Sequence, residues 1–420
     1  MIILWITNSL LPEANALLGK RTEVKGTGGW VMSMAKALRK EETVKIHIAA
    51  ISTLVSEYTT LEGESIIYHA IPKGKGDTKY NTDYEDAYRR ICNDINPDVV
   101  HIHGTEFPHA LAALRACGKE RVVVSLQGLV SIIARYNTGG ITTWEALKNV
   151  TFHDFVRGGI IRQQRHMYKS GEYEIAVLKE AKYVIGRTSF DREHAWAVNS
   201  GIKYYHCDEI LREEFYNSGY WEYSKCSPYS IFMSQSAFPI KGVHKVVEAL
   251  GIVKQHHPSV HLRVAGQDLT YRDGCWKDEL RLTGYGKIVR KLIKKYDLSE
   301  QIFFTGRLNA DDMIKEYLNA NLFLCPSSIE NSPNSLAEAQ ILGVPSIGSY
   351  AGGIPDMMRG KEDFLYRFDD VEMLAYKICS VFELKEKCEN ALFRMAVRER
   401  HNPERITREL VEIYRNLIKE

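Results

Sequence analysis

Short apolar runs alternate with amphipathic segments along nearly the whole chain, and this alternation is the strongest limit on its fold. Apolar runs bounded by turn residues predict buried strands, and apolar residues spaced three and four apart predict helices. In the first half, the predicted strands are residues 2–7, 43–51, 98–104, 121–128, 183–191 and 203–210, and the predicted helices are 28–40, 83–95 and 107–117. This order is typical of a doubly wound parallel sheet.

A second series of the same kind follows a polar, tyrosine-rich stretch at 214–230 that we interpret as a linker. Its predicted strands are 230–236, 260–266, 302–307, 321–327 and 345–349, and its predicted helices are 242–256, 287–298, 310–318 and 334–342. We predict an α/β protein with two doubly wound Rossmann-like domains, 1–215 and 226–400, facing a cleft. A C-terminal helix at 401–420 is expected to return to the first domain. In such sheets, ligands bind at the carboxyl ends of the strands.

Charge and cysteine usage argue against several classes of protein. The formal charge of +2 and the lack of a basic tail indicate no nucleic-acid partner. None of the 8 cysteines stands in a C-x-x-C pair, and no apolar run approaches the roughly 20 residues of a transmembrane helix. The first residues lack a basic leader region, so they predict a strand rather than a signal peptide. We expect a cytoplasmic protein whose membrane contacts are peripheral.

The segment from Cys325 to Pro345 predicts a strand, a loop and a helix in that order. Ser332 is a favourable N-cap, and Pro333 suits the first helical position because its missing N–H would be unpaired there in any case. The helix is predicted to end near Leu342, with Gly343 after it.

Two glutamates flank the start of this predicted helix. Glu330 lies on the loop at the carboxyl end of the strand, and Glu338 lies in the second helical turn, on the face of Asn334 and Ser335. The helix N-terminus favours a phosphate, and ionised carboxylates accept hydrogen bonds from sugar hydroxyls. The order therefore indicates a ligand that is part phosphate and part sugar, although each glutamate alone is equally compatible with a solvated surface position.

A pair of glycines, Gly28 and Gly29, opens the predicted helix that follows the first strand. Without Cβ atoms, their N–H groups are accessible to a phosphate. A simple turn is the alternative interpretation of this pair when it is considered alone.

The order of these motifs resembles the retaining nucleotide-sugar glycosyltransferases of the GT-B fold, glycosyltransferase family 4. The resemblance covers nearly the whole chain, and the glutamate pair is its most specific mark. The motifs that carry it are Gly28-Gly29, "DVVHIHG" at 98–104, "PIKG" at 239–242, "VAG" at 264–266, "FFTGRL" at 303–308, and Glu330 with Glu338.

The resemblance implies a role for each matched residue. Gly28 and Gly29 resemble the loop that approaches the donor diphosphate, and Lys241 resembles the lysine that pairs with that diphosphate and stabilises the leaving group. Glu330 resembles the residue that positions the donor sugar, and Glu338 the one that holds the ribose hydroxyls. The other binding candidates are Arg307 and Leu308, which resemble the loop beside the base, Gly266 and Gln127, and Ser332, Asn334 and Ser335 at the helix start.

The sequence departs from the family pattern at one cationic position. An arginine usually stands five residues before the lysine, where this chain has Ser236. One phosphate-binding cation is therefore missing, and Arg187 or Arg307 is a candidate to supply the charge.

A second departure concerns a histidine in the first domain. Many members carry a histidine at the position of Gln127, and His103 is the candidate to take part of its role. His101 lies two positions earlier on the same strand face, and we interpret it as structural.

A third departure is Ser332-Pro333, where the family often has Phe-Gly. Pro333 offers no N–H to the sugar, so the identity of the donor sugar stays open.

The acidic pairs Asp311-Asp312 and Asp369-Asp370 do not form a D-x-D motif at a strand end, and we interpret them as helix-start or solvated acids. In the family, the lysine and the helix dipole take the place of a metal ion. We therefore expect neither a metal nor a cofactor.

A helical insert at about 138–180 contains Arg157, Arg162, Arg165 and Lys169. Its basic face is compatible with an anionic membrane surface or acceptor, and equally with a solvated helix face.

We expect an enzyme that moves a sugar from a nucleotide diphosphate sugar, with UDP favoured, to a glycan or lipid-linked acceptor, with retention at the anomeric carbon, in cell-surface polysaccharide synthesis. Two alternatives stay open: a sugar-nucleotide epimerase of the same fold, and a non-catalytic nucleotide-sugar-binding partner of a transferase.

Overall fold

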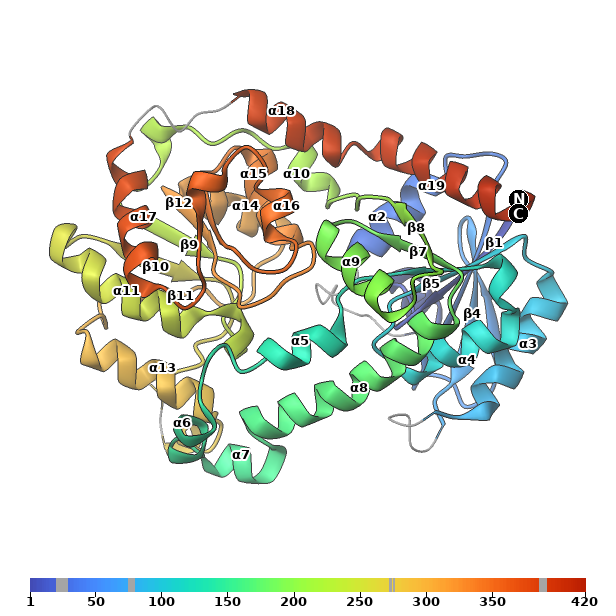
Figure 1. Cartoon of the computed structure of the whole chain (residues 1–420), viewed down its shortest axis with the longest axis horizontal. Coiled ribbons are helices and arrows are strands. Elements are labelled where there is room, and N and C mark those ends of the chain that lie inside the picture. The colour runs from blue at the N-terminus through green and yellow to red at the C-terminus, as the bar shows by residue number, and fades with distance from the viewer. Residues whose placement is uncertain (20–28, 75–79, 272–273, 275, 385–390) are drawn as a thin grey trace. The chain divides into compact units, whose positions relative to one another are not determined.

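The computed structural model describes residues 1–19, 29–74, 80–271, 274, 276–384 and 391–420. The chain forms two compact units, and each is assembled from separate stretches of sequence (Figure 1). Unit 1 contains residues 1–132, 168–212 and 400–420, and unit 2 contains residues 133–167 and 213–399.

Unit 1 is built on an eight-stranded sheet with the order β3-β4-β2-β1-β5-β6-β7-β8. Its strands are β1 (Ile2–Thr7), β2 (Lys45–Ser52), β3 (Thr59–Glu62), β4 (Ile66–Pro72), β5 (Val99–His103), β6 (Val122–Ser125), β7 (Tyr183–Gly186) and β8 (Lys203–His206). All neighbours pair in parallel except β3 and β4, which form an antiparallel hairpin at the sheet edge. The parallel α/β sheet predicted from the sequence is confirmed, but this hairpin was not predicted.

The helices of unit 1 fall between these strands, with one helix added from the end of the chain. They are α1 (Pro12–Leu17), α2 (Gly29–Leu38), α3 (Thr82–Ile95), α4 (Pro108–Cys117), α9 (Ser189–Val198) and α19 (Pro403–Lys419), with the larger part of α8 (Ile160–Glu180). Helix α19 is bonded to the core of the unit, because the hydroxyl of Tyr414 accepts from the Trp5 indole at 3.0 Å and lies 2.6 Å from Nδ1 of His101.

Unit 2 is built on a six-stranded sheet, all parallel, with the order β11-β10-β9-β12-β13-β14. Its strands are β9 (Ser230–Met233), β10 (His261–Val264), β11 (Ile302–Phe304), β12 (Leu322–Cys325), β13 (Ser346–Ser349) and β14 (Leu365–Tyr366). Its helices are α6 (Thr143–Lys148), α7 (Phe152–Arg157), α10 (Glu213–Asn217), α11 (Val243–His256), α12 (Trp276–Glu279), α13 (Gly284–Lys295), α14 (Ala310–Asn319), α15 (Asn334–Leu342), α16 (Ile354–Met357), α17 (Val371–Glu383) and α18 (Ala391–Arg400), and α5 (Val130–Tyr136) crosses its boundary.

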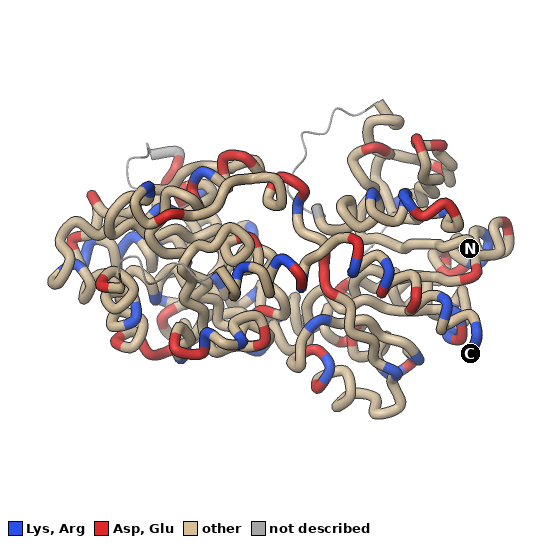
Figure 2. Tube along the Cα trace, turned by 90° about the horizontal axis from the view of Figure 1, so that it is seen from above, with Lys and Arg blue, Asp and Glu red and all other residues tan. Residues whose placement is uncertain are grey.

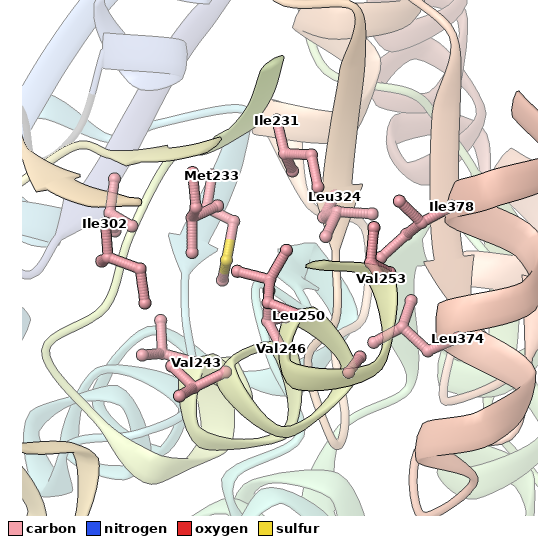
Figure 3. Close-up of a cluster of buried hydrophobic side chains, with 14 of the residues drawn as sticks. Ile231, Met233, Val243, Val246, Leu250, Val253, Ile302, Leu324, Leu374 and Ile378 are labelled. Atoms are coloured by element: carbon pink, nitrogen blue, oxygen red, sulfur yellow. The ribbon is translucent and has the colours of Figure 1, made fainter. Parts of the chain in front are cut away.

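The core of unit 2 lies between the sheet and the helices α11 and α17 (Figure 3). Helix α11 contributes Val243, Val246, Leu250 and Val253, whose spacing of three and four places them on one face. They meet strand residues that include Met233 and are fully buried or nearly so. The helical periodicity read from residues 242–256 is therefore the periodicity of this buried face.

Residues 133–167 pack on unit 2, although they follow the first strands in sequence. Ile141, Ala146 and Ile160 join its apolar core. The Asp154 carboxylate accepts from the backbone N–H of Gly284 at 2.8 Å. The predicted first domain of 1–215 is thus wrong for this segment, because its apolar partners in the core and polar partners such as Gly284 belong to unit 2, much later in the chain.

Basic and acidic residues are interspersed along the chain trace (Figure 2). Among the helices that the structure describes, none is both long enough and apolar enough to cross a membrane.

Candidate functional site

The loop between β12 and α15 is the centre of the candidate site in unit 2. Helix α15 begins at Asn334 and ends before Gly343, which takes the left-handed conformation with φ 86°. The predicted range of 334–342 is confirmed, but the predicted N-cap is wrong by one residue. Pro333 itself is the N-cap with ψ 111°, an extended value, so Ser332 lies outside the helix and does not cap it.

Lys241 and Glu330 form an ion pair within this loop region. The Lys241 Nζ lies 2.5 Å from Oε1 of Glu330, and the Ser327 hydroxyl donates to the same oxygen at 2.8 Å. Lys241 follows β9 and Glu330 follows β12, and these strands are neighbours in the sheet. The carboxyl ends of adjacent parallel strands therefore bring together two residues that are 89 positions apart in sequence.

The pair is partly shielded from solvent, with side-chain exposures of 23% for Lys241 and 19% for Glu330. Burial acts to lower the pKa of Lys241, but the Glu330 carboxylate outweighs it and holds that pKa above the ordinary value. Lys241 is therefore a cation at neutral pH. The sequence predicted separate contacts for the two residues and did not predict that they pair with each other.

A glycine loop after β13 packs against the backbone of Glu330. The N–H of Gly353 donates to the Glu330 carbonyl at 2.9 Å, and Gly352 has φ +59°. A Cβ added at Gly352 would lie 1.9 Å from that carbonyl oxygen, so only glycine fits there. This contact holds the backbone of Glu330 in place.

Replacing Gly352 with alanine is expected to lower the free energy of unfolding by about 2–4 kcal/mol, because a left-handed residue with a side chain is strained and the Cβ overlaps the Glu330 backbone. Gly360→Ala is the matched control, since Gly360 has φ +80° but no atom within 4 Å of the added Cβ. Chemical denaturation of both variants measures the difference. Equal losses would mean that the contact with Glu330 is not tight.

Cys325 is the last residue of β12 and the cysteine nearest to Glu330 in the sequence. Burial, followed by the charge of Glu330, raises the pKa of this thiol to about 12. The sulfur therefore stays protonated at neutral pH and is a poor nucleophile.

The other predicted binding residues of unit 2 lie on α15 and on the loops after β10 and β11. Glu338 lies on α15 and is 5% exposed. Gly266 and Gly306 exchange backbone hydrogen bonds of 2.8 and 3.1 Å, which joins the two loops just before Arg307 and Leu308. The Arg307 side chain is exposed.

Asn334 and Ser335 form the first turn of α15, where Ser335 accepts from the Tyr317 hydroxyl through its carbonyl oxygen at 2.9 Å. Ser236, at the position of the family arginine, is 3% exposed and its hydroxyl lies 3.8 Å from the Cβ position of Gly266. The loop after β9 thus meets the loop after β10 at the carboxyl edge of the unit 2 sheet.

The histidines of unit 1 differ in their bonding. His101 is bonded on both ring nitrogens, to Tyr414 and to Ser125 at 2.6 Å each. His103 is 2% exposed, and neither of its ring nitrogens has a hydrogen-bond partner within the described residues. Burial, and then the charge of Arg187, lowers the pKa of His103 to about 3. His103 is therefore a neutral imidazole at the end of β5.

Arg187 does not supply a spare cation, which corrects the expectation that it compensates for Ser236. Its buried guanidinium forms an ion pair with Glu209 and donates to the carbonyl oxygens of Leu126 and, at 3.2 Å, Gln127. The Gln127 backbone is thereby held beside Arg187. Of the two candidate cations, only Arg307 presents an exposed side chain.

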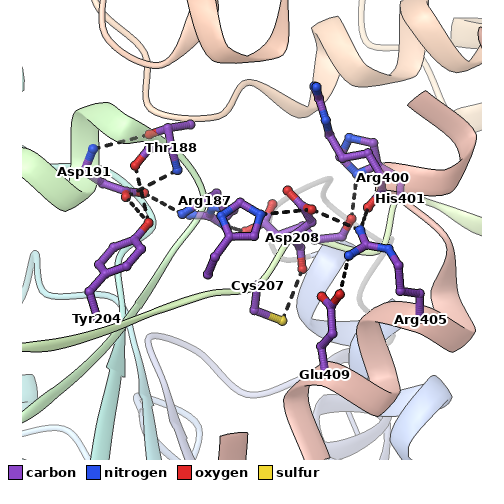
Figure 4. A network of polar contacts seen from close by, with 12 residues as sticks. Arg187, Thr188, Asp191, Tyr204, Cys207, Asp208, Arg400, His401, Arg405 and Glu409 are labelled. Atoms are coloured by element: carbon purple, nitrogen blue, oxygen red, sulfur yellow. Dashed lines mark hydrogen bonds and ion pairs between the residues drawn. The ribbon is translucent and has the colours of Figure 1, made fainter. Parts of the chain in front are cut away.

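The surroundings of Arg187 are an extended polar network (Figure 4). On one side, Tyr204 donates to Asp191 at 2.6 Å. On the other, Arg405 of α19 donates to Asp208 at 3.1 Å. This network joins β7, β8 and the last helix, and it explains the burial of Arg187 as a structural role.

Sequence reasoning missed Glu106, which follows β5 directly. The Asn8 amide donates to its Oε1 at 2.5 Å, and burial raises the pKa of this carboxyl. A carboxylate two residues past the predicted strand at 98–104 was the available signal. Gly28, the first of the predicted phosphate-binding glycines, lies outside the described residues, and Gly29 begins α2.

Comparison with known proteins gives two family matches on this chain. Residues 224–392 match the family described as Glycosyl transferases group 1, and residues 25–137 match the family described as Glycosyl transferase 4-like. The first lies in unit 2 with the Lys241–Glu330 pair, and the second lies largely in unit 1.

Curated relatives match parts of the chain. Sulfoquinovosyl transferase SQD2 of Arabidopsis thaliana is 28% identical over 34% of this chain and 26% of its own length. The putative colanic acid biosynthesis glycosyltransferase WcaL of Salmonella typhimurium is 24% identical over 42% of each chain. This chain therefore spans less than half the length of these relatives.

Solved structures match over the full chain. Sucrose-phosphate synthase of Thermosynechococcus elongatus has a TM-score of 0.68 at 16% identity and covers 100% of this chain and 99% of its own. Anabaena Alr3699/HepE in complex with UDP has a TM-score of 0.65 at 14% identity and covers 99% of this chain and 100% of its own. At such identities the similarity establishes the fold, which agrees with the two α/β units described above.

Proposed function

Since the chain belongs to the GT-B-fold glycosyltransferases of the family 4 type, we propose that it transfers a sugar from a UDP-sugar to a hydroxyl group of a glycan or lipid-linked acceptor. The anomeric configuration of the sugar is retained, and the product belongs to cell-surface polysaccharide synthesis. The observation that carries the proposal is the Lys241–Glu330 pair at the carboxyl edge of the unit 2 sheet.

The pair suits a donor that carries both phosphate and sugar. Lys241 is a shielded cation that can neutralise a diphosphate, and Glu330 is a carboxylate that can accept hydrogen bonds from sugar hydroxyls. When the donor binds, the diphosphate replaces Glu330 as the partner of Lys241. Glu330 is then released to the sugar, while Ser327 and the Gly353 contact keep it in place.

The transfer breaks the bond between the anomeric carbon and the diphosphate oxygen and forms a bond from that carbon to the acceptor oxygen. Negative charge grows on the leaving diphosphate, and Lys241 together with the N-terminal end of α15 stabilises it. The acceptor attacks from the face that the diphosphate leaves, and the acceptor proton passes to the leaving phosphate oxygen. The protonated, buried Cys325 takes no part in this step.

Two similar proteins support UDP as the nucleotide. Anabaena Alr3699/HepE has a structure in complex with UDP-glucose, and trehalose-6-phosphate synthase of Escherichia coli has one bound with UDP-2-fluoro glucose. The colanic acid name of WcaL, together with the capsular polysaccharide biosynthesis glycosyltransferase CapM of Staphylococcus aureus, supports a role in polysaccharide synthesis.

A donor panel tests the proposal. UDP-, GDP- and ADP-sugars are screened for thermal stabilisation, where a ligand at 100 times its Kd adds about 2.7 kcal/mol. Each stabilising donor is then followed for sugar release. A stabilising UDP-sugar that is slowly hydrolysed supports a transferase. Binding without any turnover favours the non-catalytic alternative, for which the buried Ser236 in place of an arginine is the specific observation.

UDP is expected to bind with the same affinity in EDTA as in Mg²⁺, because Lys241 supplies the positive charge that a metal would otherwise supply. Titration calorimetry of the chelator-treated protein with UDP measures this directly. A loss of affinity in EDTA that Mg²⁺ or Mn²⁺ restores would contradict the proposed use of Lys241.

A further inference from the structure

The helices α6 and α7 and the turn between them carry exposed apolar side chains. Trp144 is 67% exposed, Phe152 62% and Phe155 84%. Leu147, Val150 and Val156 are also exposed on the same segment. We call these six residues the α6–α7 face. Apolar side chains gathered in this way are uncommon on a soluble surface and mark an interaction site.

Buried residues of the same segment attach both helices to unit 2. Ala146 of α6 packs in the unit 2 core, and Asn149 accepts from Lys291 at 2.6 Å. On α7, Asp154 accepts from Gly284 of α13 and also caps the helix through Thr151. Because both helices are bonded to unit 2 on their buried side, the apolar side chains cannot turn into that core.

Exposed cations occur in the same segment and in the first turns of α8 that follow it. Lys148, Arg157, Arg162 and Arg165 are all exposed, and Nζ of Lys148 lies 4.9 Å from the ring centroid of Trp144. The acids of the segment are the exposed Glu145 and the buried Asp154, which is already bonded to Gly284. Aromatic residues flanked by long basic side chains are the composition of elements that lie in the headgroup region of a bilayer.

We propose that the α6–α7 face is a membrane-docking surface that inserts Trp144, Phe152 and Phe155 into the interface of an anionic bilayer. The surrounding arginines and Lys148 contact the lipid phosphates while their stems cover apolar surface. This inference rests on the proposed function, because it concerns the acceptor of the proposed transfer. A protein docked in this way favours the lipid-linked class of acceptor.

A second copy of the chain fits this face less well. In a two-fold symmetric dimer the same patch meets itself, so the basic side chains would face one another with Glu145 as the exposed acid between them. Anionic lipid headgroups supply the negative charge that such a dimer lacks. Charge complementarity therefore selects a lipid surface as the partner.

The first experiment uses matched tryptophans. Trp144 is 67% exposed on α6, and Trp196 is 65% exposed on α9. The full-length protein, Trp144→Phe and Trp196→Phe are mixed with vesicles of phosphatidylcholine and phosphatidylglycerol that carry brominated acyl chains. The lipid-dependent quenching of fluorescence is expected to disappear in Trp144→Phe and to remain in Trp196→Phe. Quenching that survives in Trp144→Phe would overturn the proposed insertion.

The second experiment measures partitioning by vesicle sedimentation. Combined replacement of Phe152 and Phe155 by serine is expected to weaken binding at least about tenfold, because their apolar area no longer enters the interface. Replacement of Arg157, Arg162 and Arg165 by glutamate is expected to weaken it roughly 100-fold at low salt. Leu392→Ser is the control for apolar exposure, since Leu392 is 79% exposed on α18.

The outcomes separate the two proposals. UDP titration without vesicles shows whether the donor site is intact in every variant. Wild-type protein that binds UDP but ignores anionic vesicles would overturn the membrane surface alone. A change in oligomeric state in Phe152→Ser/Phe155→Ser, seen by light scattering without any change in lipid binding, would assign the face to a second copy.

Discussion

Replacing Lys241 with methionine is expected to lower kcat for sugar transfer by about 10²–10³-fold, the range found when one preorganised charge-stabilising group is removed. Methionine keeps the approximate length of the side chain but carries no charge. The growing charge on the diphosphate then has only the helix N-terminus and the surrounding loops to stabilise it. Steady-state kinetics with the best donor measures the loss.

Lys245→Met is the matched control for this change. Lys245 lies on α11, forms an ion pair with Glu248 at 3.2 Å and has a side-chain exposure of 22%, against 23% for Lys241. Its replacement is expected to leave kcat nearly unchanged. If the two variants lost equal activity while both stayed folded by thermal unfolding, Lys241 would have no special role in the transfer.

Glu338→Gln is expected to weaken UDP and the UDP-sugar alike by about 1.5–3 kcal/mol, or roughly 10- to 150-fold in Kd, because one charge-assisted hydrogen bond to the ribose is lost. The contact is the same in the ground state and in the transition state. The Michaelis constant should therefore rise more than kcat falls.

Glu330→Gln is expected to behave in the opposite way. In the proposed function its contact is to the sugar being transferred, so UDP affinity should change little while kcat falls. Calorimetric titration with UDP and steady-state kinetics, both carried out on Glu338→Gln and Glu330→Gln, test these two expectations. Equal losses of UDP affinity would show that the two carboxylates share one role.

The strand and helix pattern of both sheets was predictable because each element carries its own periodicity. The run at 322–325 is buried at every position, and residues 334–342 end at a glycine with a left-handed backbone. The hairpin of β3 and β4 was less visible. Strand β3, residues Thr59–Glu62, is short, has Leu61 as its one apolar residue and is exposed at alternate positions, so it lacks the continuous apolar run by which the other strands were found.

Contacts between distant parts of the chain were not predictable. Residues 133–167 carry ordinary helical patterns, and nothing in those patterns says which sheet the helices cover. Periodicity likewise identifies an apolar helix face without saying whether that face meets a core. Phe155 and Trp144 are therefore apolar residues that pattern alone would place inside, whereas the structure exposes them.

The candidate site was predictable as a set of residues but not as a set of bonds. Lys241 and Glu330 were chosen for separate contacts with the donor, yet the structure joins them. Arg187 was chosen for its charge alone, and Glu209, which neutralises it, follows β8 some twenty positions later in the chain. The sequence shows that a residue is charged but not which residue of opposite charge will pair with it in the folded protein.

The bond between Trp5 and Tyr414 has a consequence for biosynthesis. The two residues are 409 positions apart, so at 5–20 residues per second the ribosome adds Tyr414 about 20–80 s after Trp5. Throughout that interval the nascent first sheet lacks the helix that covers Trp5 and His101. That part of the sheet is therefore exposed until α19 is made, and a ribosome that stalls before Pro403 leaves unit 1 without its last core helix.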